Sequence, residues 1–447
     1  MMGRLEAQEN LFYRFRIEDH VPADHMLRQI DWFLDFDAIR ADLEALYSHT
    51  GRPSVGPELM LRMLLVGYLC GIRSERRLVE EVHLNLAYRW FCKLGLEGRV
   101  PDRSTFSKNR HGRFADGEVM RRLFETVVAK CVAFGFVGGT DAAVDGSTLE
   151  ADANRDRKHG SDVIGQIWSQ KEQVQRPVAE YLTKLAEHDA RPAEPGPKHK
   201  PPKYISESDP EAAWSVKDGP GRFSYETNYL IDTDHGIIID VEATPARLSQ
   251  EIVAAKAMLE RASDRHEFKP DRIAADGSYG TGPLLAWLLK RDVTPHVPVL
   301  DRKRQSKGKF SLRHFQYDKA RDSFTCPEGH KLTLRSTNED TRINHYRASA
   351  TNCGACQIRK ACTSGPSRTV TRHLDEGARQ TARDLRHTWQ YDESRRRRKK
   401  VEMLFAHLKR HLGFKRLRLR GLKGATEEFL LAATAQNLKR LAKMVPC

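Results

Sequence analysis

Two short runs of sequence decide the fold: Thr-Asp-Ala-Ala-Val-Asp-Gly-Ser at 140–147 and Arg-Ile-Ala-Ala-Asp-Gly-Ser-Tyr-Gly at 272–280. In each run a short apolar stretch leads into Asp-Gly, with Asp145 and Asp276 as the aspartates. We interpret both as strands that end at the aspartate, because glycine lets the backbone turn away. A carboxylate at the carboxyl end of a strand would lie where ligands bind an open α/β sheet.

A third acidic residue, Glu402, lies in a stretch with helical periodicity, Tyr-Asp-Glu-Ser-Arg-Arg-Arg-Arg-Lys-Lys-Val-Glu-Met-Leu-Phe-Ala-His-Leu-Lys-Arg at 391–410. Apolar residues recur at helical spacing and predict a buried stripe. At about 100° per residue, a sector roughly 60° wide beside this stripe carries one acid and three cations: Arg395, Arg398, Glu402 and Lys409. The cations favour phosphate contact, with a solvated helix start as the alternative.

Three carboxylates in a basic chain suit divalent metal chemistry on a phosphate backbone. Mg²⁺ prefers carboxylate oxygens and keeps waters or substrate phosphates as its other ligands. Two such ions about 4 Å apart would activate an attacking hydroxyl and stabilise the departing oxygen of a phosphodiester. Taken singly, an Asp-Gly pair is more often an ordinary turn than a ligand, so the interpretation depends on all three acids together.

The charge balance indicates a polyanionic partner. The 447 residues include 75 lysines and arginines against 60 aspartates and glutamates, a net charge of +15. DNA fits better than an anionic membrane, because the basic residues are dispersed and not gathered in an amphipathic tail. The N-terminus lacks a secretory signal, and the most apolar stretch, 59–72, contains Arg62 and is too short to span a bilayer. We therefore expect a cytoplasmic protein without a membrane partner.

Several motifs resemble the DDE transposases of bacterial insertion sequences. Near the three acids they are Val-Asp-Gly-Ser-Thr-Leu-Glu-Ala-Asp-Ala-Asn (144–154), Ala-Asp-Gly-Ser-Tyr-Gly (275–280) and the spacing Arg398-x3-Glu402-x6-Lys409. The N-terminal part is similar to one branch of the family through four motifs: Gly-Arg-Pro-Ser (51–54), Ile-Arg-Ser-Glu-Arg-Arg-Leu (72–78), Tyr-Arg-Trp-Phe (88–91) and Pro-Asp-Arg-Ser-Thr-Phe-Ser (101–107). The resemblance covers most of the chain.

The resemblance implies a fold, a metal site and DNA contacts. The implied fold is an α/β ribonuclease H-like catalytic core with an all-helical N-terminal domain and a Cys-rich insertion before the last catalytic helix. Asp145, Asp276 and Glu402 would bind the catalytic Mg²⁺ or Mn²⁺. Arg398 and Lys409 match the family pattern and would hold phosphates. Some relatives have a tyrosine where this chain has Arg395. The chain departs from the family pattern at this position, so the resemblance assigns no role to Arg395.

Other acids near the first motif are rivals or helpers. Asp141 shares strand parity with Asp145 and would face the same side of a strand. We favour Asp145 because the family motif falls on it. We interpret Glu150 and Asp152 as solvated loop acids or as groups that support the ligands.

Four of the eight cysteines are clustered: Cys326 opens Cys-Pro-Glu-Gly-His, and Cys353-Gly-Ala-Cys356 and Cys362 follow. A Cys-x2-Cys turn with two further cysteines suits tetrahedral Zn²⁺, which would stabilise a small domain with little core. The spacing is irregular, and His330 or His345 could replace one thiolate. Structural zinc and reduced thiols in a loop-rich insertion both stay open, whereas no histidine and acid single out a catalytic cysteine.

Residues 1–135 are predicted to form a helical domain that binds DNA. Apolar positions recur at helical spacing through 57–72 and 74–96, and Ser104 is a candidate N-cap for a third helix. That helix would present polar residues near its start, as a recognition helix does to bases and phosphates: Thr105, Ser107, Lys108, Asn109 and Arg110. An ordinary surface helix is the alternative, and the resemblance favours recognition of the element ends.

The rest of the chain divides into three predicted parts. Residues 136–300 change to short apolar runs and predict a strand, a hairpin, a helix, a strand, a helix and a strand, the order that the resemblance implies. Within them, the polar stretch 157–222 predicts a mobile insertion. Residues 301–385 form the basic, Cys-rich insertion, whose run 302–309 would reach over the DNA end or be a solvated linker. Residues 386–447 would supply the catalytic helix and the C-terminal helices that complete the core.

Together these features predict a transposase of a bacterial insertion sequence that cuts and joins DNA with Mg²⁺. Its partners would be double-stranded DNA, as terminal repeats and target, and a second copy of the chain when DNA is bound. Two alternatives remain: a transposase-derived DNA-binding protein that no longer cuts, and a ribonuclease H-like nuclease without strand transfer. No Gly-x4-Gly-Lys-Ser/Thr loop occurs, so we expect no nucleotide hydrolysis.

Overall fold

A computed structural model of the whole chain divides into two compact units. One unit comprises Met1–Val137, Met403–Lys415 and Lys423–Cys447, and the other comprises Gly138–Glu402 and Arg416–Leu422. The structure describes residues 15–44, 47, 54–111, 114, 118–160, 176–181, 202–217, 219–246, 250–299 and 309–445. The motif residues 51–53, much of the predicted mobile insertion and the basic run 302–308 lie outside these ranges.

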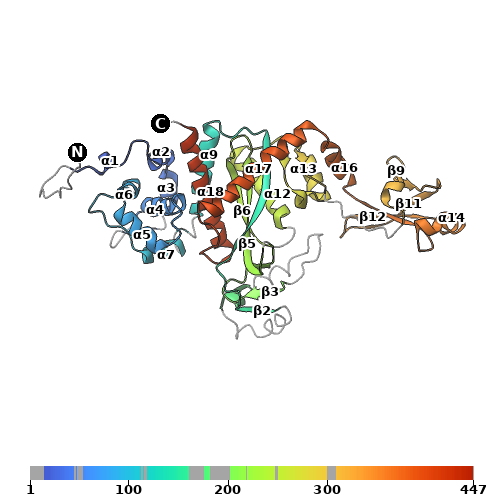
Figure 1. Cartoon of the computed structure of the whole chain (residues 1–447), viewed down its shortest axis with the longest axis horizontal. Coiled ribbons are helices and arrows are strands. Elements are labelled where there is room, and N and C mark those ends of the chain that lie inside the picture. Colours follow the sequence, from blue (N-terminus) through green and yellow to red (C-terminus); the bar gives the residue numbers. More distant parts are fainter. Residues whose placement is uncertain are drawn as a thin grey trace, which may run out of the picture. The chain divides into compact units, whose positions relative to one another are not determined.

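A mixed sheet forms the centre of the second unit (Figure 1). Its strands are β1 (Asp141–Glu150), β4 (Ala213–Ser215), β5 (Arg222–Asp232), β6 (Ile238–Pro245), β7 (Arg272–Ala274) and β8 (Thr294–His296). The strand order is β4-β5-β1-β7-β8, with β6 also paired to β5. The strands β4, β5, β6 and β1 pair antiparallel, whereas β1, β7 and β8 run parallel to one another. This topology is consistent with the ribonuclease H-like core that the resemblance implies.

Helices cover the sheet and leave little of its longest strand exposed. Residues 223–232 of β5 are all buried, as expected of a strand with a layer on each face. Helix α12 (Gln250–His266) packs on β6, β5 and β1, while α13 (Gly282–Leu289) packs on β8 and on α16 (Glu376–Leu385). The predicted succession of strand, hairpin, helix, strand, helix and strand is thus present.

The strand around Asp145 differs from the prediction. We predicted that it ends at Asp145, but β1 continues to Glu150 because β5 supplies a hydrogen-bonding partner along the whole length. Gly146 therefore does not end the strand in a turn; it lets neighbouring side chains approach the backbone closely. A Cβ at Gly146 would lie 3.0 Å from the side-chain oxygen of Asn228 and 3.8 Å from the hydroxyl of Tyr279.

Part of the predicted mobile insertion 157–222 belongs to the folded unit. Besides β4, it contains β2 (Lys158–Gly160) and β3 (Tyr204–Ser206), which pair with each other. The ring of Trp214 packs edge-on against Tyr204 and Phe223. A few aromatic contacts therefore anchor a stretch whose composition is mostly polar.

The other unit is helical in its described residues, as predicted for 1–135. Its helices are α1 (Ile17–His20), α2 (Met26–Phe33), α3 (Asp37–Glu44), α4 (Pro57–Leu69), α5 (Glu75–Leu84), α6 (Leu86–Phe91), α7 (Arg103–His111), α9 (Val119–Ala133), the end of α17 (Trp389–Arg410) and most of α18 (Gly421–Met444). No helix in the described part of the chain is long and apolar enough to cross a membrane.

Two helix boundaries in this unit differ from the prediction. The stretch 74–96 forms two helices, because the side chain of Asn85 accepts hydrogen bonds from the backbone of Ala87 and Tyr88 and so starts α6. Helix α7 begins at Arg103, so Ser104 lies inside it and is not its N-cap.

The last part of the chain, predicted to complete the sheet domain, divides between the units. From Met403 onward most of it groups with the N-terminal helices. Arg73 explains part of this grouping, since it forms an ion pair with the buried Glu428 and stacks 3.7 Å from the ring centre of Phe414. The helix that carries Glu402 thus ends in a different unit from the one in which it begins.

The Cys-rich insertion is a folded sheet and not the loop-rich segment considered above. Its five antiparallel strands are β9 (Gln316–Asp318), β10 (Ser323–Thr325), β11 (Lys331–Asn338), β12 (Ile343–Ala348) and β13 (Thr369–His373). Two short helices, α14 (Ala350–Ala355) and α15 (Arg359–Cys362), connect β12 to β13. We call residues 309–373 the cysteine module.

Candidate active site

The three predicted acids come from three elements of the second unit. Asp145 lies midway along β1, Asp276 follows β7 as the N-cap of a short 3-10 turn (Gly277–Tyr279), and Glu402 lies on α17. Ala143 of β1 pairs with Ala274 of β7, so Asp145 and Asp276 both stand two residues beyond that pair. Neighbouring strands are about 4.8 Å apart, which brings these two aspartates side by side.

Arg398 joins Asp145 to Glu402. One guanidinium nitrogen donates to Asp145 Oδ2 at 2.9 Å, and the other donates to Glu402 Oε1 at 2.8 Å. The side chain of Asp145 is 16% exposed and that of Glu402 is 51% exposed, so the cluster is buried at β1 and open at α17. Arg398 was predicted to hold a DNA phosphate; in this structure its charge instead neutralises the two carboxylates.

The electrostatics of Asp145 reflect burial among like charges. Burial raises the pKa of Asp145 to about 6, Arg398 and the backbone N–H of Gly146 lower it, and Asp276 and Glu402 raise it. Both other acids therefore act on the titration of this one group. A carboxylate held in this way gains most from a cation, since burial disfavours its charged form.

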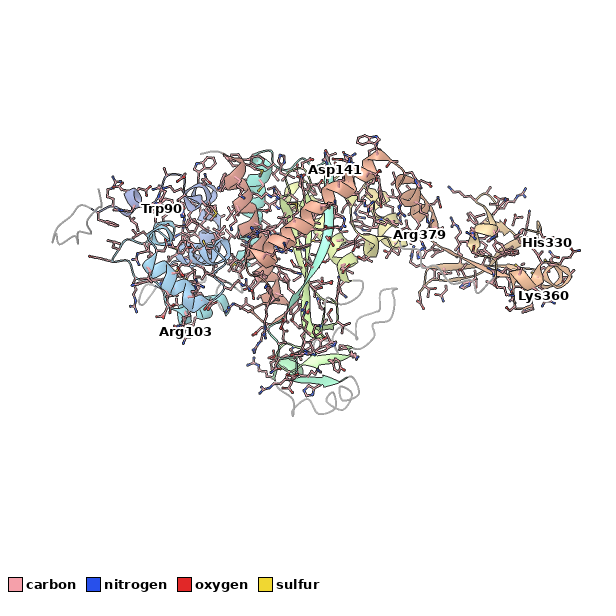
Figure 2. The ribbon with its side chains drawn as sticks, viewed as in Figure 1. Trp90, Arg103, Asp141, His330, Lys360 and Arg379 are labelled. Atoms are coloured by element: carbon pink, nitrogen blue, oxygen red, sulfur yellow. The ribbon has the colours of Figure 1, made fainter. Side chains whose placement is uncertain are left out.

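The rival Asp141 has a different environment. It is 5% exposed, and its carboxylate binds Arg272 at 2.8 Å and Arg397 at 3.3 Å. The buried hydroxyl of Ser394 on α17 lies 3.5 Å from the same carboxylate and 2.7 Å from His296 of β8. Figure 2 labels Asp141 on its strand. Its charge is already balanced by two arginines, so Asp141 fastens α17 to the sheet.

A group of residues beside Asp276 was not predicted. The hydroxyl of Ser278 lies 2.5 Å from Asp276 Oδ1 and 2.9 Å from Glu251 Oε2 on α12, and the backbone N–H of Ser278 donates to Asp276 at 2.8 Å. Burial and the neighbouring Glu251 raise the pKa of Glu226 to about 7. Among the described residues, the buried hydroxyl of Tyr279 has no hydrogen-bond partner. The Asp-Gly-Ser motif could have indicated Ser278, whereas no local pattern points to Glu251 or Glu226.

The donors suit a hard divalent cation, although they do not form a finished cage. Within the described ranges, no group of three or more His, Cys, Asp or Glu side chains is arranged to hold a metal ion. The guanidinium of Arg398 supplies the positive charge between Asp145 and Glu402 in this structure. Carboxylate oxygens around a buried, readily protonated aspartate nevertheless match the ligand preference of Mg²⁺ or Mn²⁺.

The other predicted DNA contacts are spread over both units. Arg395 is exposed on α17, and Lys409 is part-buried in the end of α17 that belongs to the helical unit. Lys108 is exposed on α7, and the side chain of Arg110 lies outside the described residues. Asn109, predicted to face outward, is buried, and its amide donates to the backbone oxygen of Thr105.

Glu150 and Asp152 pair with the basic segment that follows α17. Arg416 lies 3.8 Å from Glu150 and 3.3 Å from Asp152, while Arg420 lies 3.1 Å from Asp152. The backbone N–H of Leu417 donates to the oxygen of Glu150. These acids therefore hold the segment 416–420 against the end of β1, away from the ligand role.

Two family models match the chain. The family described as a transposase domain, DUF772, matches residues 15–112, and the family described as a transposase DDE domain matches residues 325–442. Both families are transposase families, and the two matches support a DDE-type transposase. Glu402 and the four clustered cysteines lie within the second match, whereas Asp145 and Asp276 lie outside both.

Individual proteins add little to these two matches. No curated protein matches the chain. Among solved structures it is similar to the piggyBac transposase in a cryo-EM synaptic complex with hairpin DNA, at 10% identity and a TM-score of 0.34, over 94% of this chain and 73% of that one. A likeness this low carries no weight for the fold or the site. Support for a DDE-type transposase therefore comes from the two family models.

Proposed function

We propose that this transposase serves a bacterial insertion sequence, binding the ends of the element and catalysing metal-dependent cleavage and strand transfer of DNA. The observation that supports the proposal is that Asp276 and Glu402 lie near enough to Asp145 to raise its pKa. Parallel pairing of β1 with β7 brings the two aspartates together, and Arg398 connects the third acid to the first.

Asp145, Asp276 and Glu402 would hold Mg²⁺ or Mn²⁺ on a ribonuclease H-like core. Such ions, when bound, activate an attacking hydroxyl and stabilise the leaving oxygen of a phosphodiester. The chain's own residues prepare the site: β1 holds Asp145 in a rigid strand, and Ser278 fixes the orientation of Asp276 through two hydrogen bonds. The second candidate metal, Zn²⁺, would serve the separate cysteine module.

Arg398 would act as a counter-ion that changes partner. Without DNA its guanidinium neutralises Asp145 and Glu402. A planar guanidinium binds phosphate oxygens as readily as carboxylate oxygens. We infer that cation binding by the acids releases Arg398 to a backbone phosphate, so that the predicted phosphate role belongs to the DNA-bound state.

Further DNA contacts would come from Arg395 and Lys409 on α17 and from Lys108 and Arg110 on α7. The net charge of +15 supports a polyanionic partner. The helical unit would read the terminal repeats, and two copies would pair on DNA so that both ends are cut and joined to a target. Action on bacterial DNA would take place at the nucleoid in the cytoplasm.

The proposal is tested by cleavage of the element's own ends. The inverted repeats that flank the gene are labelled and incubated with the purified chain and Mg²⁺. We expect nicked and joined products from the parent and none from Asp145→Asn, Asp276→Asn or Glu402→Gln. Glu150→Gln is the matched control, since that acid lies on β1 but pairs with Arg416, and it should cut like the parent.

Each other outcome identifies a different protein. Cleavage without joined products indicates a nuclease that lacks strand transfer. Specific binding of the ends without cleavage indicates a transposase-derived DNA-binding protein. Undiminished cleavage by any of the three acid variants would show that the site is wrongly assigned.

A further inference from the structure

The cysteine module has a small core of its own. Its buried cluster consists of Phe315, Phe324, Leu332, Tyr346, Ala348, Cys362 and Val370. Partly buried side chains, Cys326 and Cys353 among them, pack against this cluster. Small domains with so little buried apolar surface commonly depend on a disulfide or a metal ion for stability. The cysteines therefore lie where such a crosslink would have most effect.

The first cysteine lies in a tight turn between β10 and β11. The backbone N–H of Cys326 donates to the oxygen of His330 at 2.9 Å, and that of Gly329 donates to the oxygen of Cys326 at 2.9 Å. Gly329 has a φ of +76°, a conformation that glycine adopts without strain. The sequence Cys-Pro-Glu-Gly-His thus closes the end of a hairpin and directs Cys326 to one side of it.

The other three cysteines come from the short helices after β12. Cys353 is near the end of α14, Cys356 follows that helix, and Cys362 ends α15. The backbone N–H of Arg359 donates to the oxygen of Cys356, and that of Cys362 to the oxygen of Ile358. The two helical turns therefore present the Cys-x2-Cys pair and Cys362 from the same connection.

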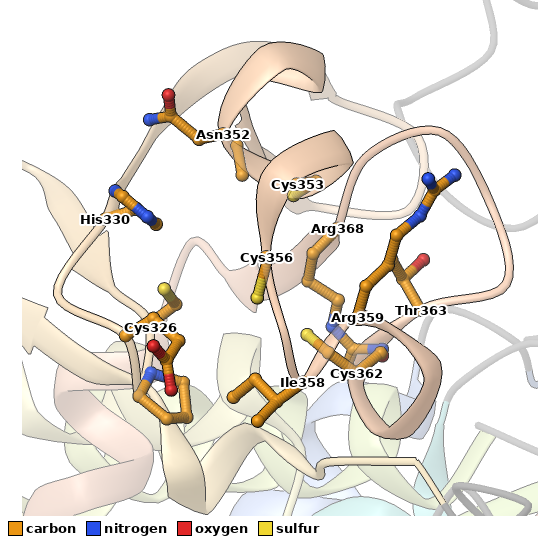
Figure 3. Close-up of a pocket in the computed structure, with 13 residues that line it drawn as sticks. Cys326, His330, Asn352, Cys353, Cys356, Ile358, Arg359, Cys362, Thr363 and Arg368 are labelled. Atoms are coloured by element: carbon orange, nitrogen blue, oxygen red, sulfur yellow. The ribbon is translucent and has the colours of Figure 1, made fainter.

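All four thiols line a single pocket. Its wall includes Cys326, Cys353, Cys356 and Cys362, with His330 and Ile358 beside them. Figure 3 shows these side chains arranged around one space, with the sulfurs of Cys326, Cys356 and Cys362 turned toward it. Within the described part of the chain, none of these thiols forms a disulfide. Two separate elements, a hairpin turn and a helical connection, thus converge on one set of soft ligands.

Two arginines of the pocket provide positive charge for thiolates. Arg368 donates to the backbone oxygens of Cys362 and Phe310, which places its guanidinium beside the pocket. Arg359 also lines the pocket. Four mutually unfavourable thiolates become stable together when a divalent cation lies among them.

We propose that Cys326, Cys353, Cys356 and Cys362 bind one structural Zn²⁺, which fastens the β10–β11 turn to the α14–α15 connection. The side chains of the described residues do not form a finished metal cage. Zinc binding would therefore require the four sulfurs to move closer together. Soft thiolates in tetrahedral number select zinc over the hard cations expected at the carboxylates. His330 also lines the pocket, but the four thiols already complete a tetrahedral set, so it is left outside the ligands.

The test measures metal on the full chain, purified untagged under reducing conditions. We expect about one zinc per chain by elemental analysis, and tetrahedral thiolate-to-metal absorption when Co²⁺ replaces it. Each of the four ligand variants should retain less than about a fifth of that zinc: Cys326→Ser, Cys353→Ser, Cys356→Ser and Cys362→Ser. Cys70→Ser, a part-buried cysteine outside the module, and His330→Ala should retain all of it.

The remaining outcomes overturn the proposal or revise its ligands. Absence of zinc, with no Co²⁺ spectrum from the reduced parent chain, shows that the pocket holds free thiols. Absence of zinc together with loss of titratable thiols in air shows a disulfide instead. Loss of zinc in His330→Ala but not in Cys353→Ser would refute the four-cysteine set. Because zinc content and the Co²⁺ spectrum are measured without DNA, they are independent of the proposed cleavage activity.

Discussion

The carboxylate cluster and the cysteine pocket are two candidate metal sites built on different supports. Asp145 and Asp276 are positioned by parallel strands of a sheet whose longest strand, β5, is buried along almost its whole length, and Arg398 already neutralises part of the acidic charge. The cysteine pocket lies in a module with a small core, and its ligands come from a turn and two short helices.

The difference concerns what a metal does for each site. At the carboxylates the scaffold is complete before any cation binds, so metal should control chemistry more than folding. At the cysteines the ligands themselves connect the elements, so metal binding and local folding become one equilibrium.

The largest effect is expected for Asp276→Asn. Cleavage should fall by at least about 10³-fold, because the site loses one of its three proposed metal ligands and with it the stabilisation of charge at the reacting phosphate. Thermal unfolding should change little, since asparagine can still accept the hydrogen bonds from Ser278. Cleavage of labelled ends and calorimetry measure the two effects. Cys356→Ser should instead lose local stability, which would be measured as faster proteolysis within 309–373. If Asp276→Asn is itself unfolded, the contrast between the two metal sites is refuted.

A second effect concerns pH. Burial raises the pKa of Asp145 to about 6, above its ordinary value near 4. The folded chain therefore gains stability from this proton below about pH 4 and loses that gain as the pH rises through about 6. Asp145→Asn carries no charge to bury, so without metal it should be more stable than the parent above pH 6, by up to about 3 kcal/mol.

Denaturant unfolding with and without Mg²⁺ at about pH 5 and about pH 8 measures this effect. Mg²⁺ should stabilise the parent only at the higher pH, because the protonated carboxyl is a poor ligand. It should not stabilise Asp145→Asn at either pH. Equal stabilisation of both proteins would place the cation elsewhere.

A smaller effect is expected for Arg398→Gln. Loss of the guanidinium leaves Asp145 and Glu402 without their cation, so divalent metal should bind roughly 3- to 10-fold more tightly. Cleavage should nevertheless fall, because the proposed phosphate contact is missing. Titration with Mn²⁺ followed by cleavage assays separates the two quantities. Arg395→Gln, an exposed position one turn earlier on α17, should leave metal affinity unchanged, and weaker metal binding by Arg398→Gln would refute the counter-ion role.

The smallest effect is expected for Ser278→Ala. The hydroxyl between Asp276 and Glu251 is lost, but the backbone N–H still donates to Asp276. One hydrogen bond of about 1 kcal/mol corresponds to roughly a 5-fold loss of cleavage rate. The apparent affinity for Mg²⁺ should change with the rate if Ser278 orients the ligand. A rate loss in Ser278→Ala that leaves the metal dependence untouched would place Ser278 outside the ligand support.

Local sequence patterns were sufficient where neighbours along the chain decide the structure. The helical stripe around Glu402 is buried as predicted, at Val401, Leu404, Phe405, Leu408 and Leu412. The hairpin of β5 and β6 and the helices that follow were also predictable, because periodicity reports which face of each element is buried. The transposase family was predictable for the same reason, since its motifs are short runs of consecutive residues.

Contacts between distant residues could not be predicted in the same way. Asp145 and Arg398 are 253 positions apart, and their ion pair follows from how α17 meets β1. The continuation of β1 beyond Gly146 depends on β5, and the support of Asp276 by Glu251 depends on α12. The division of α17 between two units likewise has no local signature.

Neighbouring positions along the chain were enough to indicate the family resemblance, the helical and strand periodicities and the residue types that can bind metal. Only the tertiary structure decided that Asp141 is bound by two arginines while Asp145 is buried among acids, and that four thiols from a turn and two helices share one pocket. Charge balance and burial are properties of three-dimensional surroundings, so identical side chains four residues apart acquire different roles.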